Sequence, residues 1–183
     1  RIEGLGIDIG AGADGTVWGV GTDGTVWRYT DPSWEYMNLS GALRVDVDPQ
    51  GSAWVVLENG EMRHFDGSAW QVIPGNSRDI GVGADGTVWG VGTDGRVYRH
   101  GPGAPGDWQD MEGIETARID VDPHGVAWTV QDNGRIWRSD GTPGGWIPVP
   151  GAEGQDIGVG GDGSVWIAEA SGRVSRWNEV NGS

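Results

Sequence analysis

Aromatic and charged side chains recur at fixed places along this chain and are its strongest candidates for ligand chemistry. One position differs among five copies of a repeated pattern, and it is occupied by Trp27, Arg63, Tyr98, Trp137 and Ser175. A residue that varies among copies is typical of an outward-facing position. Because an aromatic face suits the apolar C–H face of a sugar ring, the three aromatic residues and Arg63 are candidates for unequal sugar-binding pockets. Scattered exposed aromatic residues with no ligand are the alternative.

Two further series of tryptophans follow the same pattern. Trp34, Trp70, Trp108 and Trp146 each come after a loop rich in Gly, Pro and Asp. They either cap an outer strand, with the indole N–H bonded to a loop carbonyl, or border pockets between repeats, so we include them as candidate ligand-binding residues. The other series is present in every copy, which favours packing over a stacking platform for a ligand: Trp18, Trp54, Trp89, Trp128 and Trp166.

Carboxylates offer a weaker candidate for metal binding, and nothing in the chain predicts catalysis. The pairs Asp46/Asp48 and Asp120/Asp122 stand two residues apart, so each pair shares one face of a strand. Carboxylate oxygens suit Ca²⁺, but a calcium loop usually supplies more than two of them. We therefore expect no cofactor, with Ca²⁺ as the alternative. The chain has no cysteine and no Gly-x-Ser-x-Gly, and its three histidines lie at non-equivalent places. We expect no enzymatic activity.

The repeats themselves set the positions of these residues. The stretch 79–99, DIGVGADGTVWGVGTDGRVYR, differs from 8–28 only at Ala11/Val82, Thr25/Arg96 and Trp27/Tyr98. Weaker copies begin at residues 44, 118 and 156, which indicates a chain built by duplication. We predict a single domain, 1–183, with repeats at approximately 8–43, 44–78, 79–117, 118–155, and 156–183 together with 1–7.

Each repeat has the pattern of short strands. Apolar residues alternate in its first segment, as in Ile80/Val82, and the next segment is rich in valine and tryptophan. Asp-Gly or Asn-Gly pairs such as Asp85-Gly86 separate the segments and are typical of tight hairpin turns. No segment alternates at helical spacing. The sequence therefore predicts an all-β protein, a β-propeller of about five four-stranded antiparallel blades.

The ends of the chain predict how this ring closes. The fifth repeat lacks a tryptophan for a fourth strand, and residues 1–4 resemble the end of such a strand. We expect the N- and C-terminal segments to share the last blade. The repeats also alternate, since the first, third and fifth contain DIGxG and the second and fourth contain DVDP. An alternating ring would close evenly with six repeats, whereas five repeats place two DIGxG repeats side by side. We therefore expect five blades with one irregular junction. The alternative is a ring from which a sixth blade is absent.

Composition restricts the partners. The formal net charge is −15, which argues against nucleic acid and anionic membrane surfaces, because both require a basic patch. No run of 18 apolar residues exists, so we expect no membrane insertion. We expect a monomer. No signal peptide is visible, and the cellular compartment cannot be read from the sequence.

The stretches 12–28 and 83–99, GADGTVWGVGTDGTVWR and GADGTVWGVGTDGRVYR, resemble the tectonin-type β-propeller repeat of tectonin and fish-egg-lectin-like lectins. This resemblance implies a lectin that binds glycans, including microbial-surface or methylated sugars, at several similar sites between neighbouring blades. Six blades are usual in that family. A non-catalytic module that binds proteins or serves a structural role, engineered or trimmed from a larger protein, is the alternative function.

Overall fold

The computed structural model describes residues 5–101 and 107–177 of the 183-residue chain. All regular elements in these ranges are strands, and no helix there is long and apolar enough to cross a membrane. The strands form antiparallel sheets that we call blades 1 to 5 in chain order. Blades 1, 3 and 5 are the odd blades, and blades 2 and 4 are the even blades.

The strand bounds follow the repeats. Blade 1 contains β1 (Gly6–Ala11), β2 (Val17–Gly21), β3 (Val26–Thr30) and β4 (Ser33–Tyr36). Blade 2 contains β5 (Ala42–Val47), β6 (Ala53–Leu57), β7 (Glu61–Phe65) and the first part of β8 (Trp70–Val82). Blade 3 contains the second part of β8, β9 (Val88–Gly92), β10 (Arg96–His100) and β11 (Trp108–Glu115). Blade 4 contains β12 (Arg118–Val121), β13 (Ala127–Val130), β14 (Arg135–Ser139) and β15 (Trp146–Glu153), and blade 5 contains β16 (Asp156–Val159), β17 (Val165–Ala168) and β18 (Val174–Trp177).

Local sequence explains these hairpins. Among the described residues, the glycine of each Asp-Gly or Asn-Gly pair has a positive φ, for example 86° at Gly15 and 84° at Gly60, a conformation that costs glycine little. The aspartate before Gly15 also accepts the N–H of Thr16 at 2.9 Å, as expected for an aspartate that stabilises its own turn. The turns therefore reverse the chain where the sequence predicts it.

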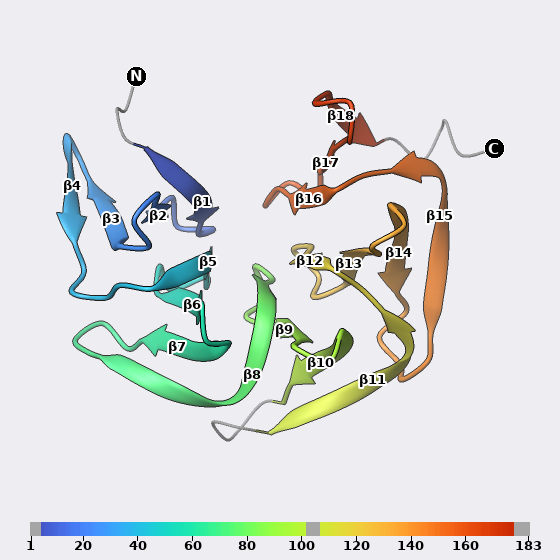
Figure 1. Cartoon of the computed structure of the whole chain (residues 1–183), viewed down its shortest axis with the longest axis horizontal. Helices are drawn as coiled ribbons and strands as arrows, with labels where there is room; N and C mark the ends of the chain where they lie inside the picture. Colours follow the sequence, from blue (N-terminus) through green and yellow to red (C-terminus); the bar gives the residue numbers. More distant parts are fainter. Residues whose placement is uncertain (1–4, 102–106, 178–183) are drawn as a thin grey trace.

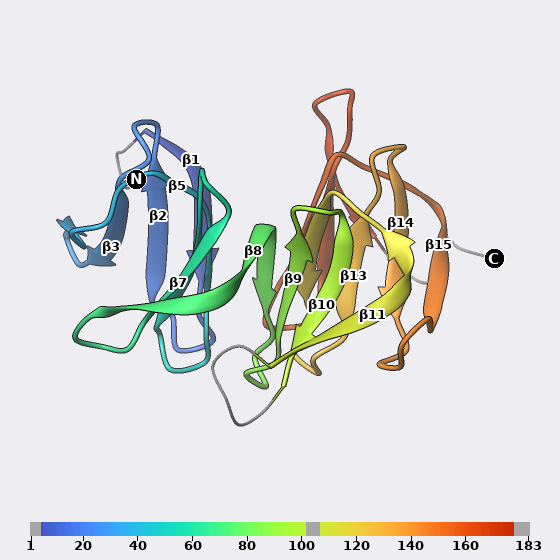
Figure 2. The same ribbon diagram turned by 60° about the horizontal axis from the view of Figure 1, so that its bottom comes forward.

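The blades are arranged around a common axis (Figure 1). The first strand of each blade is innermost, and the inner strands pack in the order β1, β5, β8, β12 and β16. The long strand β8 leaves the outer edge of blade 2 and continues as the inner strand of blade 3, as Figure 2 shows from the side. Among the described residues, β16 and β1 lack a comparable contact, and the ring opens between them in Figure 1.

The hydrophobic core lies between the blades. Each of four clusters joins the second-strand tryptophan of one blade to the inner-strand aliphatic residues of the next blade. Trp18 packs with Val45 in this way, and Trp89 packs with Ile119. A single blade could not bury either of its faces, so the stack of neighbours provides the stability.

The predicted all-β propeller of about five blades is confirmed. The expected contribution of segment 1–7 to the last blade falls mostly on residues 1–4, which lie outside the described residues. Gly6 and Ile7 belong to β1, where Gly6 pairs with Gly21 of blade 1. In the described part of the chain, the sheet of blade 5 contains three strands.

Candidate functional site

Hydrogen bonds from one inner strand to the next hold neighbouring blades at a fixed distance. In each of the first four inner strands, an aspartate accepts a backbone N–H from the following blade through its Oδ2 atom. The four bonds are Val45 to Asp8 at 2.8 Å, Val82 to Asp46 at 2.6 Å, Ile119 to Asp79 at 3.0 Å and Val159 to Asp120 at 2.5 Å. The clefts between blades are therefore built on a rigid inner frame.

Indole N–H groups connect the blades farther from the axis. Trp18 donates to the Gly51 carbonyl at 3.0 Å and Trp89 donates to the Gly125 carbonyl at 3.1 Å, each bond running from an odd blade to a turn of the next even blade. The outer tryptophans donate to carbonyls in or directly after the last strand of the preceding blade. These bonds join Trp70 to Met37 at 2.8 Å, Trp108 to Pro74 at 3.0 Å and Trp146 to Glu112 at 2.8 Å.

A cleft of about 320 Å³ lies where blade 2 meets blade 3, within the usual size of a small-ligand site. Tyr98 and Trp108 form its aromatic walls, and Gly90 and Gly92 form part of its floor. A Cβ atom at Gly92 would lie 2.8 Å from the Tyr98 ring, so glycine is needed for the ring to lie over β9. Blade 2 completes the cleft with Met62 and residues 75–77.

Hydrogen bonds orient the polar groups of this cleft. The Tyr98 hydroxyl donates to Asp94 at 2.8 Å, and the backbone N–H of Arg96 donates to the same carboxylate at 3.1 Å. Burial acts to raise the pKa of Asp94, but these hydrogen bonds outweigh it, so the pKa is lowered. The bond to Asp94 raises the pKa of Tyr98. The cleft therefore presents a neutral phenol ring beside a charged carboxylate, a combination that suits a ligand with both C–H and hydroxyl groups.

A second cleft, of about 700 Å³, lies where blade 4 meets blade 5. Trp137 lines it, together with Pro148 and Pro150 from β15 and Trp177 from β18. The indole N–H of Trp137 donates to the Gln131 side chain at 2.9 Å, which fixes the ring. Both clefts lie at junctions from an even blade to an odd blade.

Blade 1 carries the odd-blade half of the same cleft. Trp27 and Trp34 occupy the positions of Tyr98 and Trp108, and Gly19 and Gly21 occupy those of the two floor glycines. A hollow of about 760 Å³ there is lined on its other side only by residues 5–9 of the described chain. Trp27 is held by a 2.7 Å bond from its indole N–H to Thr25.

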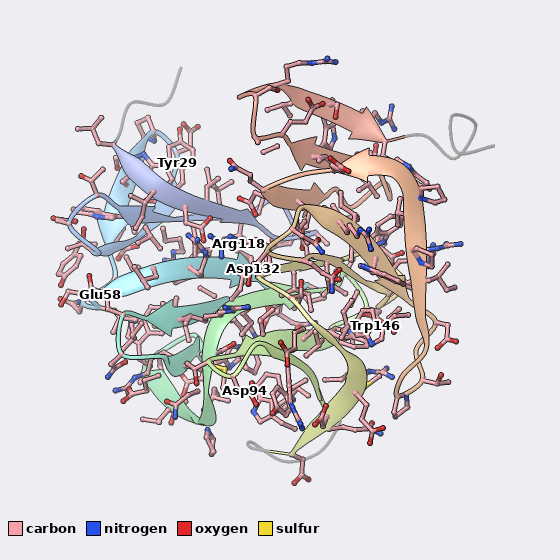
Figure 3. The ribbon with its side chains drawn as sticks, turned by 45° about the vertical axis from the view of Figure 1, so that its right-hand side comes forward. Tyr29, Glu58, Asp94, Arg118, Asp132 and Trp146 are labelled. Atoms are coloured by element: carbon pink, nitrogen blue, oxygen red, sulfur yellow. The ribbon has the colours of Figure 1, made fainter. Side chains whose placement is uncertain are left out.

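The other predicted site residues lie elsewhere. Arg63 forms an ion pair with Glu61, and neither residue lines these clefts. Trp70 packs against Trp18, with ring centroids 5.9 Å apart, and Trp146 packs against Trp89 at 6.3 Å. Figure 3 labels Trp146 toward the outer side of the ring. Both outer tryptophans serve the capping role that the sequence indicates, although their carbonyl partners belong to the preceding blade.

Several residues that line the clefts are absent from the sequence-based candidates. Met62 and residues 75–77 sit at even-blade positions with no aromatic signal, and Trp177 follows the last repeated arginine. Asp94 belongs to an Asp-Gly turn, so its sequence context indicates only a turn. The alternation of odd and even repeats is the one signal that could have identified which junctions form clefts.

The aspartates considered for Ca²⁺ are engaged by backbone groups. Asp46 accepts the N–H groups of Val82 and Val47. Asp48 accepts those of Gln50 and Ser52 and contacts His64 at 3.1 Å. Within residues 5–101 and 107–177, no group of three or more His, Asp or Glu side chains has the arrangement of a metal site.

Burial raises the pKa of the innermost carboxylates. Desolvation, with a smaller contribution from the nearby Asp8 and Asp79, raises the pKa of Asp46 to about 7. Desolvation also raises the pKa of Asp79 to about 7, against the lowering effect of Arg44 and Arg118. Arg44 lies 3.5 Å from Asp79, and Arg118 lies toward the centre of the ring in Figure 3. Because these carboxylates accept the N–H groups of the next blade, their evident role is to hold the blades together.

Solved structures share this fold. YCF48 from Cyanidioschyzon merolae matches 96% of the chain and 67% of its own chain, with a TM-score of 0.65 and 19% identity. A structure described as YCF48 bound to D1 peptide matches 93% of this chain and 62% of its own, with a TM-score of 0.61 and 18% identity. At such identities the likeness concerns the fold alone.

Sequence comparison identifies the family. Tectonin-1 of Physarum polycephalum is 41% identical over 46 residues, which make up 25% of this chain and 21% of that protein. The chain thus spans about a fifth of the length of this relative. The family model described as Tectonin domain matches residues 41–144, more than half of the chain. With five antiparallel blades that repeat the same motif, the chain belongs to the tectonin domain family.

Proposed function

We propose that this propeller is a non-catalytic lectin that binds glycans in the clefts at its even-to-odd junctions. The cleft between blades 2 and 3 carries the proposal, because it combines the rings of Tyr98 and Trp108 with the polar side chains of Asn76, Thr93 and Asp94. Aromatic faces can stack on the C–H face of a sugar, while amide, hydroxyl and carboxylate groups can bond its hydroxyls.

The chemistry of the cleft favours a small neutral or weakly polar glycan unit. The Asp94 carboxylate carries a charge at neutral pH, and the net charge of −15 disfavours strongly acidic glycans. Apolar walls such as Met62 and Trp108 favour sugars that carry methyl or acetyl groups. Each site binds weakly alone, and a monomer with two such clefts gains affinity for a dense glycan surface through avidity.

A glycan array that includes methylated and microbial-surface sugars, followed by calorimetry on the hits, tests this function. We expect about two sites per chain, at the blade 2–3 and blade 4–5 clefts, and loss of one site in Tyr98→Ala. The matched control is Arg63→Ala, which alters the same strand position in a blade where that side chain lines neither cleft. It should bind like the unaltered chain.

An array without hits, together with tight one-to-one binding to a protein, would contradict the lectin proposal. That result would support a protein-interaction module instead. Equal binding by Tyr98→Ala and the unaltered chain would leave a lectin but would exclude the blade 2–3 cleft as its site.

A further inference from the structure

A series of ring contacts crosses the junction between blades 2 and 3. The His100 ring of β10 lies 5.6 Å from the Trp54 ring of β6 and 5.0 Å from the Trp108 ring of β11, measured between centroids. The His64 ring of β7 lies 4.5 Å from the other member of this series in blade 2, Trp54. We call these four residues the ring series. It ends at Trp108, which is a wall of the blade 2–3 cleft.

The corresponding series between blades 1 and 2 contains no histidine. Its members are Arg28, Trp18, Phe65 and Trp70. The Phe65 ring lies 5.5 Å from Trp18 and 5.2 Å from Trp70, so an apolar ring fills the place that His100 occupies in blade 3. Arg28, a permanent cation, stands at the place of the other histidine. Histidine is the side chain whose charge ordinarily changes near neutral pH, and it occupies both places only at the blade 2–3 junction.

The two histidines differ in what they offer a proton. The His64 Nε2 atom lies 3.1 Å from the Asp48 carboxylate, which can accept its N–H. His100 is partly buried, and its Nε2 atom is buried without a hydrogen-bond partner among the described residues. Whichever tautomer the neutral ring adopts, an imidazolium carries an N–H on both nitrogens. Protonation of His100 therefore creates a buried charged donor that has no acceptor, and such a group is costly.

The titratable groups that act on His100 come from both blades. Burial lowers the pKa of His100, the Asp107 carboxylate just before β11 acts to raise it, and His64 acts to lower it further. Arg99, its neighbour on β10, faces the opposite side of the blade, over the tryptophan of β9. The His100 imidazole is therefore neutral at neutral pH and gains its proton only on acidification.

We propose that His100 is the positioning residue of Trp108 and that the cleft between blades 2 and 3 releases its glycan on acidification. The neutral imidazole supports the Trp108 indole, whose N–H bonds the Pro74 carbonyl of blade 2 at 3.0 Å. The protonated ring turns away from the indoles toward water and Asp107, and Trp108 loses this support. The release of glycan rests on the proposed lectin function, whereas the positioning of Trp108 does not.

Two carboxylates near the cleft respond differently to acid. Asp94 has a lowered pKa, so its charge in the cleft persists at about pH 5.5. Asp46, whose bond to Val82 spans the same junction, gains a proton as the pH falls below about 7. That proton removes a buried charge, which favours the packed junction. Substitutions of His100 leave both carboxylates in place, so a difference between variants isolates the imidazole.

Fluorine NMR of the full chain labelled with fluorotryptophan follows Trp108 without any ligand. The Trp108 resonance is assigned by its absence from Trp108→Phe. We expect its chemical shift to move in one transition below about pH 6.5. It should stay constant in His100→Phe, which introduces the ring that Phe65 provides in blade 2. The control resonance is that of Trp146, because Ser139 occupies the place of His100 beside it.

Calorimetry measures the consequence for glycan binding. The probes are N-acetylglucosamine and O-methylglucose, which carry the acetyl and methyl groups that the cleft favours. For the site that Tyr98→Ala removes, we expect about three- to tenfold weaker affinity at about pH 5.5 than at about pH 7.5. His100→Phe should bind equally at both values, and His100→Gln, which is also uncharged, should do the same if phenylalanine packs poorly. His124→Asn, which removes the exposed histidine of blade 4, is the matched control and should retain the pH dependence.

Several outcomes would overturn the proposal. The Trp108 resonance could stay unchanged on acidification, or it could move equally in His100→Phe. The pH dependence could disappear in His64→Arg and persist in His100→Phe, which would make His64 the sensor. The affinity could also stay constant while Trp108 moves, which would exclude the coupling to the ligand. Absence of sugar binding by every chain at about pH 7.5 would contradict the lectin proposal and the release together, whereas the NMR result would still decide the role of His100.

Discussion

Trp89 and Trp166 occupy the same position in closely similar repeats but lie in opposite environments. Trp89 is fully buried, donates to Gly125 and stacks near the Arg99 guanidinium, whose carbon lies 5.6 Å from the ring centroid. Trp166 is 45% exposed, and among the described residues its indole N–H bonds only Ser164 of its own turn. The contribution of a repeated residue to stability therefore depends on whether a blade follows it.

This difference predicts unequal effects of the same substitution. Trp89→Phe removes a buried indole N–H bond and leaves a small cavity, so it should lower the free energy of unfolding by about 2–3 kcal/mol. Trp166→Phe should change it by less than about 0.5 kcal/mol, as for other exposed positions. Urea denaturation followed by circular dichroism measures both. Equal losses would show that Trp166 is buried in solution.

At the scale of the strand, glycines permit the close approach of inner strands. A Cβ atom at Gly81 would meet the backbone of Asp120 at 2.9 Å, and the rigid aspartate bonds between inner strands leave little room for that backbone to move. Gly158 has the same place in blade 5, but no following strand approaches it among the described residues. The DIGxG motif thus reflects the packing of one inner strand against the next.

Substitution of these glycines separates the packing effect from strand propensity. Gly81→Ala should destabilise the protein by about 1–3 kcal/mol, because the added methyl group overpacks the junction. Gly158→Ala is the matched control and should be neutral or stabilising by about 0.5–1 kcal/mol, since alanine orders a strand at lower entropic cost than glycine. Thermal melting of both variants provides the comparison. A neutral Gly81→Ala would contradict the close approach of β8 and β12.

At the scale of the whole molecule, opposing groups of carboxylates govern the response to pH. Burial raises the pKa of Asp46 and Asp79 to about 7, so the folded state holds protons that the unfolded state releases above about pH 4. Hydrogen bonds within turns lower the pKa of the exposed Asp14, Asp23 and Asp66. Those turn aspartates stabilise the fold only while they are ionised.

The melting temperature should therefore be highest near about pH 4–5. Above that range it should fall as the pH rises to about 7, because the buried carboxylates ionise and the negative net charge grows. Below it, protonation of the turn aspartates removes their stabilisation. Melting curves from pH 3 to pH 9 at constant ionic strength test this profile. Asp46→Asn, which retains an acceptor for Val82, should flatten the fall between pH 4 and 7, and a rise in stability over that interval would contradict the assignment.

Much of the fold could be predicted because its signals are local. Period-two alternation, Asp-Gly turns and the repeat itself each involve residues within one blade, and the structure confirms the propeller that they indicate. The same local reasoning placed Tyr98 and Trp108 among the candidates, and the structure brings these two into one cleft. It could not show that Tyr98 lines a cleft and Arg63 does not, because the two residues share a strand position and only the contact with the neighbouring blade separates them.

The amino-acid sequence by itself determined the strands, the turns, the repeat and the alternation of odd and even types, because each depends on neighbours a few residues apart. Only the tertiary structure decided which junctions form clefts, which aspartates are buried and which faces of blades 1 and 5 remain exposed among the described residues. These properties depend on how one blade packs against another, and the residues that meet there, such as Asp46 and Val82 or Trp108 and Pro74, belong to different repeats. The sequence of a repeat specifies the strands and turns of its own blade. The faces of that blade become buried, and a cleft forms beside it, only where a neighbouring blade packs against it.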